Sequence, residues 1–335
     1  MAAEREVRRT QGHRVTVPAS TLGGEARSAS PSRGTPVRRT ATHASRRNRI
    51  GLAFTLPALI VVGGILAYPL LYLLYLSFST YRPLSSAEVS WAGLDNYVRL
   101  FTDSTVANSL AVTLQFTLAS VLIEIVLGTA CAILLANVML GARGRGSRIA
   151  ARLLGSAYII PFAVPAVAGA YAWRMVLDAQ FGAVNAVLGT HTPWLVSYPM
   201  LSIVVIDSWK MMPFVLFVML AAVMSIEPSQ YEAAELDGAG AVRQLFSITL
   251  PSVLPVMVIT AAFRAVDAFT KVFDTVFATT GGGPGDATRV FPLLIWRTAF
   301  THLDFGNASA QAIAALAISL VFGGALLFTQ RRNAS

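Results

Sequence analysis

The chain has 335 residues, of which 55% are hydrophobic and 13% are charged. Soluble domains carry about 25% charged residues, so this composition excludes an ordinary soluble protein and indicates a polytopic membrane protein built from helices. Residues 1–50 hold eleven arginines and three glutamates, which is +8 of the net charge of +9, so the body of the chain is nearly neutral.

Residues 1–50 are rich in Ser, Thr, Ala, Pro and Arg and poor in large apolar side chains. Such a segment cannot bury enough apolar surface to fold, so we expect a disordered basic tail. Because the tail directly precedes an apolar stretch, a membrane-proximal cytoplasmic location is favoured over nucleic-acid binding. The expected divisions are this tail, a transmembrane domain at 51–330 and a cytoplasmic end at 331–335.

Six apolar stretches are long enough to cross a bilayer, which takes about 20 helical residues. We place them at 51–79, 109–139, 153–176, 199–224, 252–279 and 307–329. Arginines collect on one side of the alternating loops, which by the positive-inside rule is the cytoplasm. Both termini are therefore expected to be cytoplasmic. Pro161 and Pro165 predict a kink in the third span.

The loop between the fourth and fifth spans, residues 227–251, predicts two short helices at an angle. Ser229 and Glu232 form an S-x-x-E capping box that starts the first helix, and Gly238 can adopt the left-handed conformation that ends it. The second helix is expected to stop before Pro251. Ala233 and Ala234 give the first helix a flat face that a partner can approach, but Glu232 can equally serve only as a cap.

The same loop resembles the EAA loop of the integral-membrane subunits of binding-protein-dependent ABC importers. The pattern E-A-A-x3-G-x9-I-x-L-P is matched by Glu232, Ala233, Ala234, Gly238, Ile248, Leu250 and Pro251. Tyr68-Pro69, Gly93-Leu94-Asp95-Asn96-Tyr97 and Thr280-Gly-Gly-Gly-Pro284 resemble the sugar-uptake branch, of the maltose, trehalose and glycerol-3-phosphate type. The resemblance covers residues 50–330.

This resemblance implies a six-span permease whose loop helix sits in a cleft of a cytoplasmic ATPase subunit. The implied coupling residues are Glu232, Ala233, Ala234, Asp237, Gly238, Leu250 and Pro251. The implied partners are a second homologous permease, two ATPase subunits that bind ATP and Mg²⁺, and an extracytoplasmic sugar-binding protein. The implied location is the bacterial cytoplasmic membrane, where the chain imports a sugar or sugar-like solute.

The fifth span carries four charges on one face, within an arc of roughly 80°. They are Arg264, Asp267, Lys271 and Asp274. The spacing lets Asp267 pair with both Arg264 and Lys271. Because isolated charges are costly in hydrocarbon, this face is either a polar wall of the solute pathway or a self-neutralising structural network.

Polar residues in two other spans are possible partners of these charges. Asp207, Trp209 and Lys210 lie in the fourth span and Glu124 in the second. Glu124 is either a bonded structural carboxylate or a proton relay. Comparison with the maltose permease instead places solute-facing positions on the adjacent face of the fifth span, at Ala265, Ala268, Phe269 and Val272. Phe269 can stack on a sugar ring or equally face lipid as apolar bulk.

No sequence motif supports an enzyme. The phosphate-binding pattern G-x-x-x-x-G-K-[ST] is absent, and the four histidines and single cysteine have no metal-ligand spacing. We therefore expect no catalytic residue, no metal and no cofactor in this chain. The alternative function is an ion-coupled secondary transporter using Asp267, Asp274 or Glu124. A third possibility is a membrane enzyme or an assembly scaffold, which only the apolar composition of the chain supports.

Overall fold

The computed structural model describes residues 42–141 and 145–333, and most of them are helical. The chain divides into two units, residues 1–61 and Val62–Ser335. The described part of the first unit is the beginning of helix α1 (Thr42–Ser77), so this helix starts before the expected boundary at residue 51. Residues 1–41 of the expected tail lie outside the described residues.

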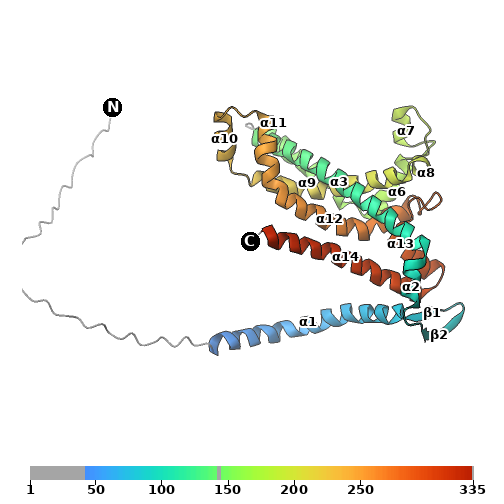
Figure 1. The fold of residues 1–335 in the computed structure, drawn as a ribbon. Helices are drawn as coiled ribbons and strands as arrows, with labels where there is room; N and C mark the ends of the chain where they lie inside the picture. Colours follow the sequence, from blue (N-terminus) through green and yellow to red (C-terminus); the bar gives the residue numbers. More distant parts are fainter. Residues whose placement is uncertain (1–41, 142–144, 334–335) are drawn as a thin grey trace, which may run out of the picture. The chain divides into compact units, whose positions relative to one another are not determined.

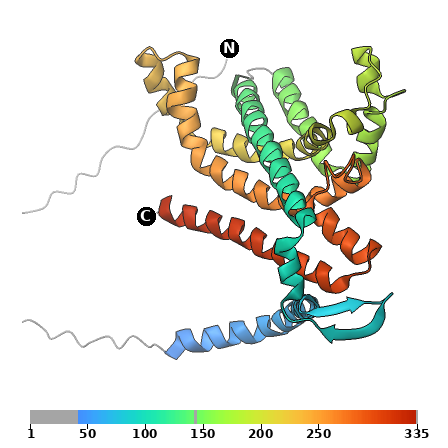
Figure 2. The ribbon, with the colours of Figure 1, turned by 45° about the vertical axis from the view of Figure 1, so that its right-hand side comes forward.

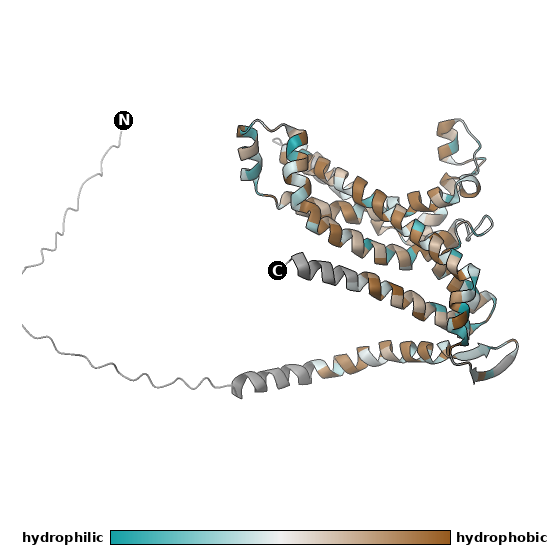
Figure 3. Cartoon of the chain, viewed as in Figure 1, coloured by the Kyte–Doolittle hydropathy of each residue, from teal (hydrophilic) through white to brown (hydrophobic). Residues whose placement is uncertain are grey.

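Five of the described helices are long and apolar enough to cross a membrane. These segments are Thr55–Ser77 in α1, α3 (Ser104–Gly141), α9 (Pro199–Met224), Ala241–Ala278, and Phe305–Gly324 in α14 (Phe305–Asn333). A sixth span is formed if the bent pair Gly155–Ala163 and Ala166–Val176 is counted as one. Figure 3 colours each residue by hydropathy and shows that hydrophobic residues, in brown, are frequent along these long helices. Five of the six expected spans are thus found with shifted ends, and the third expected span corresponds to the bent pair.

The third span is broken rather than kinked. It consists of α4 (Arg145–Tyr158), α5 (Ile160–Ala163) and α6 (Ala166–Val176), and its two halves meet at 100°. Pro161 lies in the first turn of α5, and Pro165 is the extended residue that precedes α6. Each proline lacks an amide donor, so the two together end one helix and begin the next.

Helices α3, α9 and α12 (Leu250–Ala278) pack against one another within the second unit (Figure 1). Gly128 of α3 permits the closest approach, because a Cβ there would lie 2.8 Å from Cγ1 of Val215. Around this point the core contains Ile125, Ala132, Leu135, Val215, Leu216 and Met219. Small residues at such a contact let two membrane helices bring their backbones together.

One end of the second unit carries a hairpin and several short helices, and we call it the hairpin end. Strands β1 (Ser79–Arg82) and β2 (Ser86–Trp91) are antiparallel and are followed by α2 (Asp95–Thr102). The buried amide of Asn96 donates to the carbonyls of Ser77 and Ser79 at 3.0 and 2.9 Å. The other short elements of this end are α7 (Ala183–Leu188), α8 (Trp194–Ser197), α13 (Phe291–Trp296) and η2 (Arg297–Thr301).

The opposite end carries α10 (Pro228–Leu236), α11 (Ala241–Gln244) and the π-helical turn η1 (Leu245–Thr249). Figures 1 and 2 both show α10 standing clear of the long helices, beside the first residues of the α11–α12 helix. We call this the α10 end. The first candidate site lies at this α10 end, and the second lies inside the bundle where α3, α9 and α12 meet.

Candidate functional site

Helix α10 begins at a proline and is terminated by a glycine in the left-handed conformation. Glu227 is its extended N-cap residue and Pro228 occupies the first turn, with no side-chain capping bond. The expected capping box of Ser229 and Glu232 is therefore wrong. Proline at the first helical position, which needs no amide donor, fixes the start instead. At the other end Gly238 has φ +75°, as expected, and its amide donates to the carbonyl of Glu235 at 3.0 Å.

The second helix of the loop does not stop at Pro251, contrary to expectation. Helix α11, the π turn η1 and α12 follow one another without a break, and Pro251 lies in the first turn of α12. The amide of Leu250 donates to the carbonyl of Leu245, a π-helical bond. A wider turn of this kind, placed just before the proline, accommodates its missing donor and its ring within a continuing helix.

Helix α10 is tied by a side-chain bond to the last residue of η1, which leads directly into α12. The hydroxyls of Tyr231 and Thr249 lie 2.9 Å apart, and Thr249 is buried. Residues Glu232, Ala233, Asp237 and Gly238 remain exposed, whereas Ala234 is half-buried. The loop therefore presents an outward surface from a helix whose inner side is fixed to a membrane span.

The other two expected coupling residues lie beside α10 at the start of α12. Pro251 is exposed, and Leu250 is half-buried and lines a groove against α3. Three apolar side chains that the motif did not mark also stand exposed here, namely Leu236, Val242 and Phe246. The sequence alone could have indicated these three residues, because large apolar side chains in an otherwise polar loop often mark an interaction surface.

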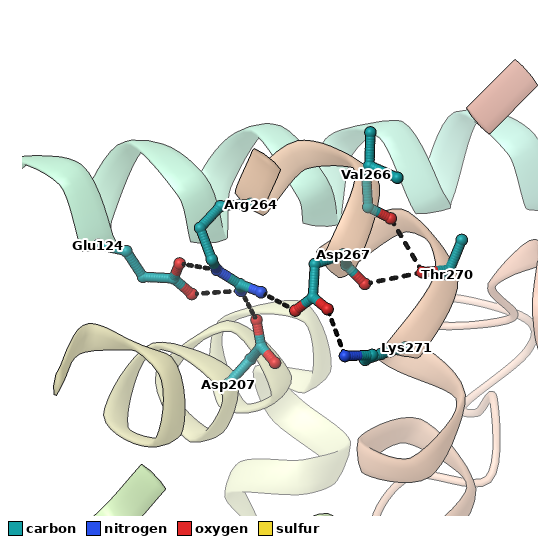
Figure 4. Close-up of polar contacts among 7 residues, drawn as sticks. All are labelled: Glu124, Asp207, Arg264, Val266, Asp267, Thr270 and Lys271. Carbon is teal, nitrogen blue, oxygen red and sulfur yellow. Dashed lines mark hydrogen bonds and ion pairs between the residues drawn. The ribbon is translucent and has the colours of Figure 1, made fainter. Parts of the chain in front are cut away.

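The second candidate site is a cluster of charged side chains at the meeting point of α3, α9 and α12, which Figure 4 shows. The guanidinium of Arg264 donates to both carboxylate oxygens of Glu124, at 2.6 and 2.9 Å, and to Asp207 at 3.1 Å. It also pairs with Asp267 one turn further along α12. Arg264 and Glu124 are 1% and 0% exposed, so the cluster joins three helices inside the bundle.

Asp267 connects this buried arginine to an accessible lysine. Its second oxygen lies 2.6 Å from Nζ of Lys271, whose side chain is 67% exposed. The expected pairing of Asp267 with both Arg264 and Lys271 is therefore confirmed. Glu124 is hydrogen-bonded to Arg264, which agrees with the interpretation of Glu124 as a bonded structural carboxylate.

Lys210 of α9 bonds to backbone carbonyls, unlike the charged residues of the cluster around Arg264, which pair with one another's side chains. Its ammonium donates to the carbonyl of Val164 at 2.6 Å and to that of Phe162 at 3.3 Å. Both carbonyls belong to the break between α5 and α6, where helical donors are missing. Because unsatisfied backbone groups are costly in a membrane, Lys210 stabilises the broken third span.

A cavity of about 330 Å³ opens beside the cluster, between the broken third span, α9 and α12. Its polar lining includes Asp207, Lys210, Asp267, Lys271 and Asp274, and its apolar lining includes Phe162, Phe214 and Phe263. Polar groups combined with aromatic faces are a common lining of small-molecule sites. The charged face of the fifth span thus borders an open space as well as forming a structural network.

The adjacent face of α12, expected from the family comparison to meet the solute, points into the protein core. Ala268, Phe269 and Val272 are each 1% exposed. Phe269 packs on Phe322 of α14, with ring centroids 6.0 Å apart. Trp209 is half-buried and packs on Trp173 of α6, with ring centroids 5.7 Å apart. These four side chains do not line the cavity beside Arg264. In the described part of the chain no three His, Cys, Asp or Glu residues are grouped as metal ligands.

Comparison with known proteins assigns the family. Residues 128–333 match the family described as binding-protein-dependent transport system inner membrane component. The chain belongs to this family. It is accordingly a multi-pass inner-membrane transport protein, and the expected resemblance and all-α polytopic fold are confirmed.

Two relatives of this permease are named for the transport of trehalose or maltose. It is 32% identical to the trehalose/maltose transport system permease protein MalF of Thermococcus litoralis, over 83% of this chain and 92% of that one. It is 31% identical to the trehalose transport system permease protein SugA of Mycobacterium tuberculosis, over 85% of this chain and 87% of that one. A solved bacterial alginate ABC transporter, in complex with an alginate-bound periplasmic protein, contains a chain with the same fold. Its TM-score is 0.69 at 23% identity, covering 86% of this chain and 95% of that one.

Proposed function

We propose that this chain is one permease subunit of an ATP-driven importer that moves a sugar or sugar-like solute across the cytoplasmic membrane. The relatives described as trehalose/maltose and trehalose transport system permease proteins support the substrate class. None of the relatives reported above is an ion-coupled transporter, so the alternative using Asp267, Asp274 or Glu124 is not carried further.

The observation that carries the proposal is the geometry of α10. It is a short helix with an exposed outer face, held at the end of the bundle by the Tyr231–Thr249 bond and joined by the turn at 237–240 to α11, which continues into a membrane span. A force applied to such a helix is transmitted to α12 rather than absorbed by a loop. This suits contact with a separate ATPase subunit, which would bind ATP and Mg²⁺ itself.

In this proposal the contact surface consists of Glu232, Ala233, Asp237, Gly238 and the exposed Pro251, with Leu236, Val242 and Phe246 as apolar anchors. Ala234 and Leu250 support it from the inner side. Large apolar side chains surrounded by polar residues are typical anchors of protein interfaces. The partners are two ATPase subunits, a second permease of the same family and an extracytoplasmic sugar-binding protein at the hairpin end.

The α10 end faces the cytoplasm in this proposal, and both termini lie on that side. The arginine distribution supports this orientation. One side of the alternating spans carries the arginines of the α3–α4 loop region, Arg243, and the C-terminal Arg331 and Arg332. Residues 1–50 would form the cytoplasmic tail and 331–335 the cytoplasmic end. The solute pathway would run along the cavity lined by Asp267, Lys271 and Asp274.

Co-purification with a co-expressed ATPase subunit tests the proposal. Gly238→Val places a β-branched side chain at φ +75°, and Glu232→Ala removes an exposed carboxylate, so both are expected to reduce ATPase retention with membrane insertion unchanged. Val187→Ala, an exposed change on α7 at the hairpin end, is the matched control. Solute uptake that continues without any ATPase subunit would contradict the proposal.

A further inference from the structure

A second cavity, of about 520 Å³, lies at the hairpin end and shares no lining residue with the cavity beside Arg264. It is bounded by the β1–β2 turn, the start of α3, α13, η2 and the first turns of α14. Most of its lining is polar or charged: Arg82, Ser85, Asp103, Thr105, Arg289, Arg297, Thr298, His302, Asp304, Asn307 and Gln311. Sequence reasoning assigned these residues no role.

Close packing of α14 on the hairpin builds this cavity. A Cβ at Gly306 would lie 2.1 Å from the carbonyl oxygen of Ser79, so only glycine allows the contact. Asp304 pairs with Arg82 across it. Asn307 and Gln311 are one helical turn apart on α14, which places them on the same face.

Four buried polar atoms of this cavity have no protein partner. They are Nε of Arg82, Nε of Arg289, Oδ1 of Asn307 and Oε1 of Gln311, and Gln311 is only 2% exposed. A buried polar atom left without a hydrogen bond costs about 1–3 kcal/mol. Two donors and two acceptors in one space therefore indicate a site for a polar molecule.

The charges of the cavity select the class of molecule. Arg82 is paired with Asp304 and Arg289 with Asp286, and the guanidinium of Arg297 donates to the carbonyl of Gly281 at 2.6 Å. Asp103 and Asp304 lie in the lining and Asp286 lies outside it on Arg289, so the three guanidiniums are balanced by three carboxylates. A ligand that both donates and accepts hydrogen bonds and carries no net charge fits this balance, and vicinal hydroxyl groups have this property.

We propose that the hairpin-end cavity binds a small polyhydroxylated solute as a separate site, outside the membrane-embedded cavity. The inference rests on the proposed function, because a sugar importer supplies such a solute at this end. The unpartnered amide oxygens of Asn307 and Gln311 accept from its hydroxyls, and Nε of Arg82 and Arg289 donate to them. The solute would occupy this cavity before it enters the membrane.

Protection of an introduced cysteine from a thiol reagent tests the site. The single native cysteine is removed as Cys131→Ala, and Ser85→Cys then reports from the exposed rim without altering either amide. The chain is purified with its co-expressed partner subunits in lipid nanodiscs and treated with a charged methanethiosulfonate, with trehalose or maltose present or absent. Val187→Cys, on the exposed surface of α7, is the matched control.

We expect trehalose or maltose, at twice its dissociation constant, to slow modification of Ser85→Cys about threefold and to leave Val187→Cys unchanged. Gln311→Met with Asn307→Ala should abolish the protection. Equal reactivity of Ser85→Cys with and without both sugars overturns the inference. Protection that survives Gln311→Met with Asn307→Ala also overturns it.

Sugar uptake by proteoliposomes separates this inference from the proposed function. If the unmodified complex imports trehalose or maltose while Ser85→Cys shows no protection, the cavity assignment alone is wrong. If the unmodified complex imports neither sugar and also fails to retain an ATPase subunit, the proposed function is wrong.

Discussion

Both carboxylate oxygens of Glu124 accept hydrogen bonds from Arg264, although 140 residues separate the two in the chain. The pair joins α3 to α12 in a region where neither side chain reaches solvent. Asp207 adds α9 to the same guanidinium. One arginine thus fixes the relative positions of three membrane helices, and its last link, through Asp267 to Lys271, ends at the cavity.

Replacing Glu124 should destabilise the fold strongly. Glu124→Leu removes both acceptors of a buried guanidinium, and breaking a buried ion pair typically costs about 3–5 kcal/mol. We expect a loss of that order in the free energy of unfolding, measured by titration of the purified chain with SDS in mixed micelles. Glu124→Gln keeps one acceptor oxygen and should lose less. Equal stability of Glu124→Leu and the unmodified chain would contradict a structural role for the pair.

Lys210→Met should loosen the break in the third span. Without the ammonium, the carbonyls of Phe162 and Val164 lose the donor that reaches them from α9. Hydrogen exchange of the amides in residues 159–168 should then rise roughly tenfold, since a hydrogen bond to a charged group contributes about 1.5–3 kcal/mol. Lys210→Arg keeps a cationic donor and should restore part of the protection. Unchanged exchange in Lys210→Met would show that the break is held by other contacts.

Tyr231→Phe should weaken the link between α10 and α12 without changing either helix. The substitution removes only the hydroxyl that bonds Thr249. If ATPase subunits act through α10, more ATP should be hydrolysed per solute imported, as measured by parallel ATPase and uptake assays in proteoliposomes. Thr249→Val should have a similar effect, and the double variant should be no worse than either single change. Additive losses would mean that the two hydroxyls act independently.

Hydropathy and spacing predicted much of this structure from the sequence. The spans follow from the length of apolar stretches, and the Arg264–Asp267–Lys271 chain follows from helical periodicity. The partner of Glu124 was not determined, because it depends on how α3 packs on α12. The capping box failed because Pro228 favours a helix start one residue earlier than Ser229. Pro251 was expected to end a helix, and only the wider turn at Leu245–Thr249 lets the helix continue.

Phe269 shows why the solute-facing surface was harder to predict than the fold. An apolar side chain in a membrane span has the same sequence signature whether it meets lipid, solute or another helix. Its burial against Phe322 is a consequence of tertiary packing that no local pattern contains. Lys210 is a similar case, because its partners are carbonyls exposed only once the third span breaks.

Asp267 and Asp274 lie two turns apart along the charged face of α12 and should respond differently to neutralisation. Asp267 is bound to both Arg264 and Lys271, so Asp267→Asn should lower the yield of assembled complex, measured by size-exclusion chromatography. Asp274 is half-buried and lines the cavity. Asp274→Asn should leave assembly intact and reduce uptake roughly tenfold, equivalent to about 1.4 kcal/mol of lost stabilisation of the solute in transit.

The contrast between these two conservative changes separates a pathway from a scaffold, because both remove one negative charge from the same helix face. Uptake is therefore to be normalised to the amount of assembled complex in each preparation. If Asp274→Asn lost assembly as Asp267→Asn does, yet transported normally per complex, the cavity beside Arg264 would be part of the structural network and the solute would cross the membrane elsewhere.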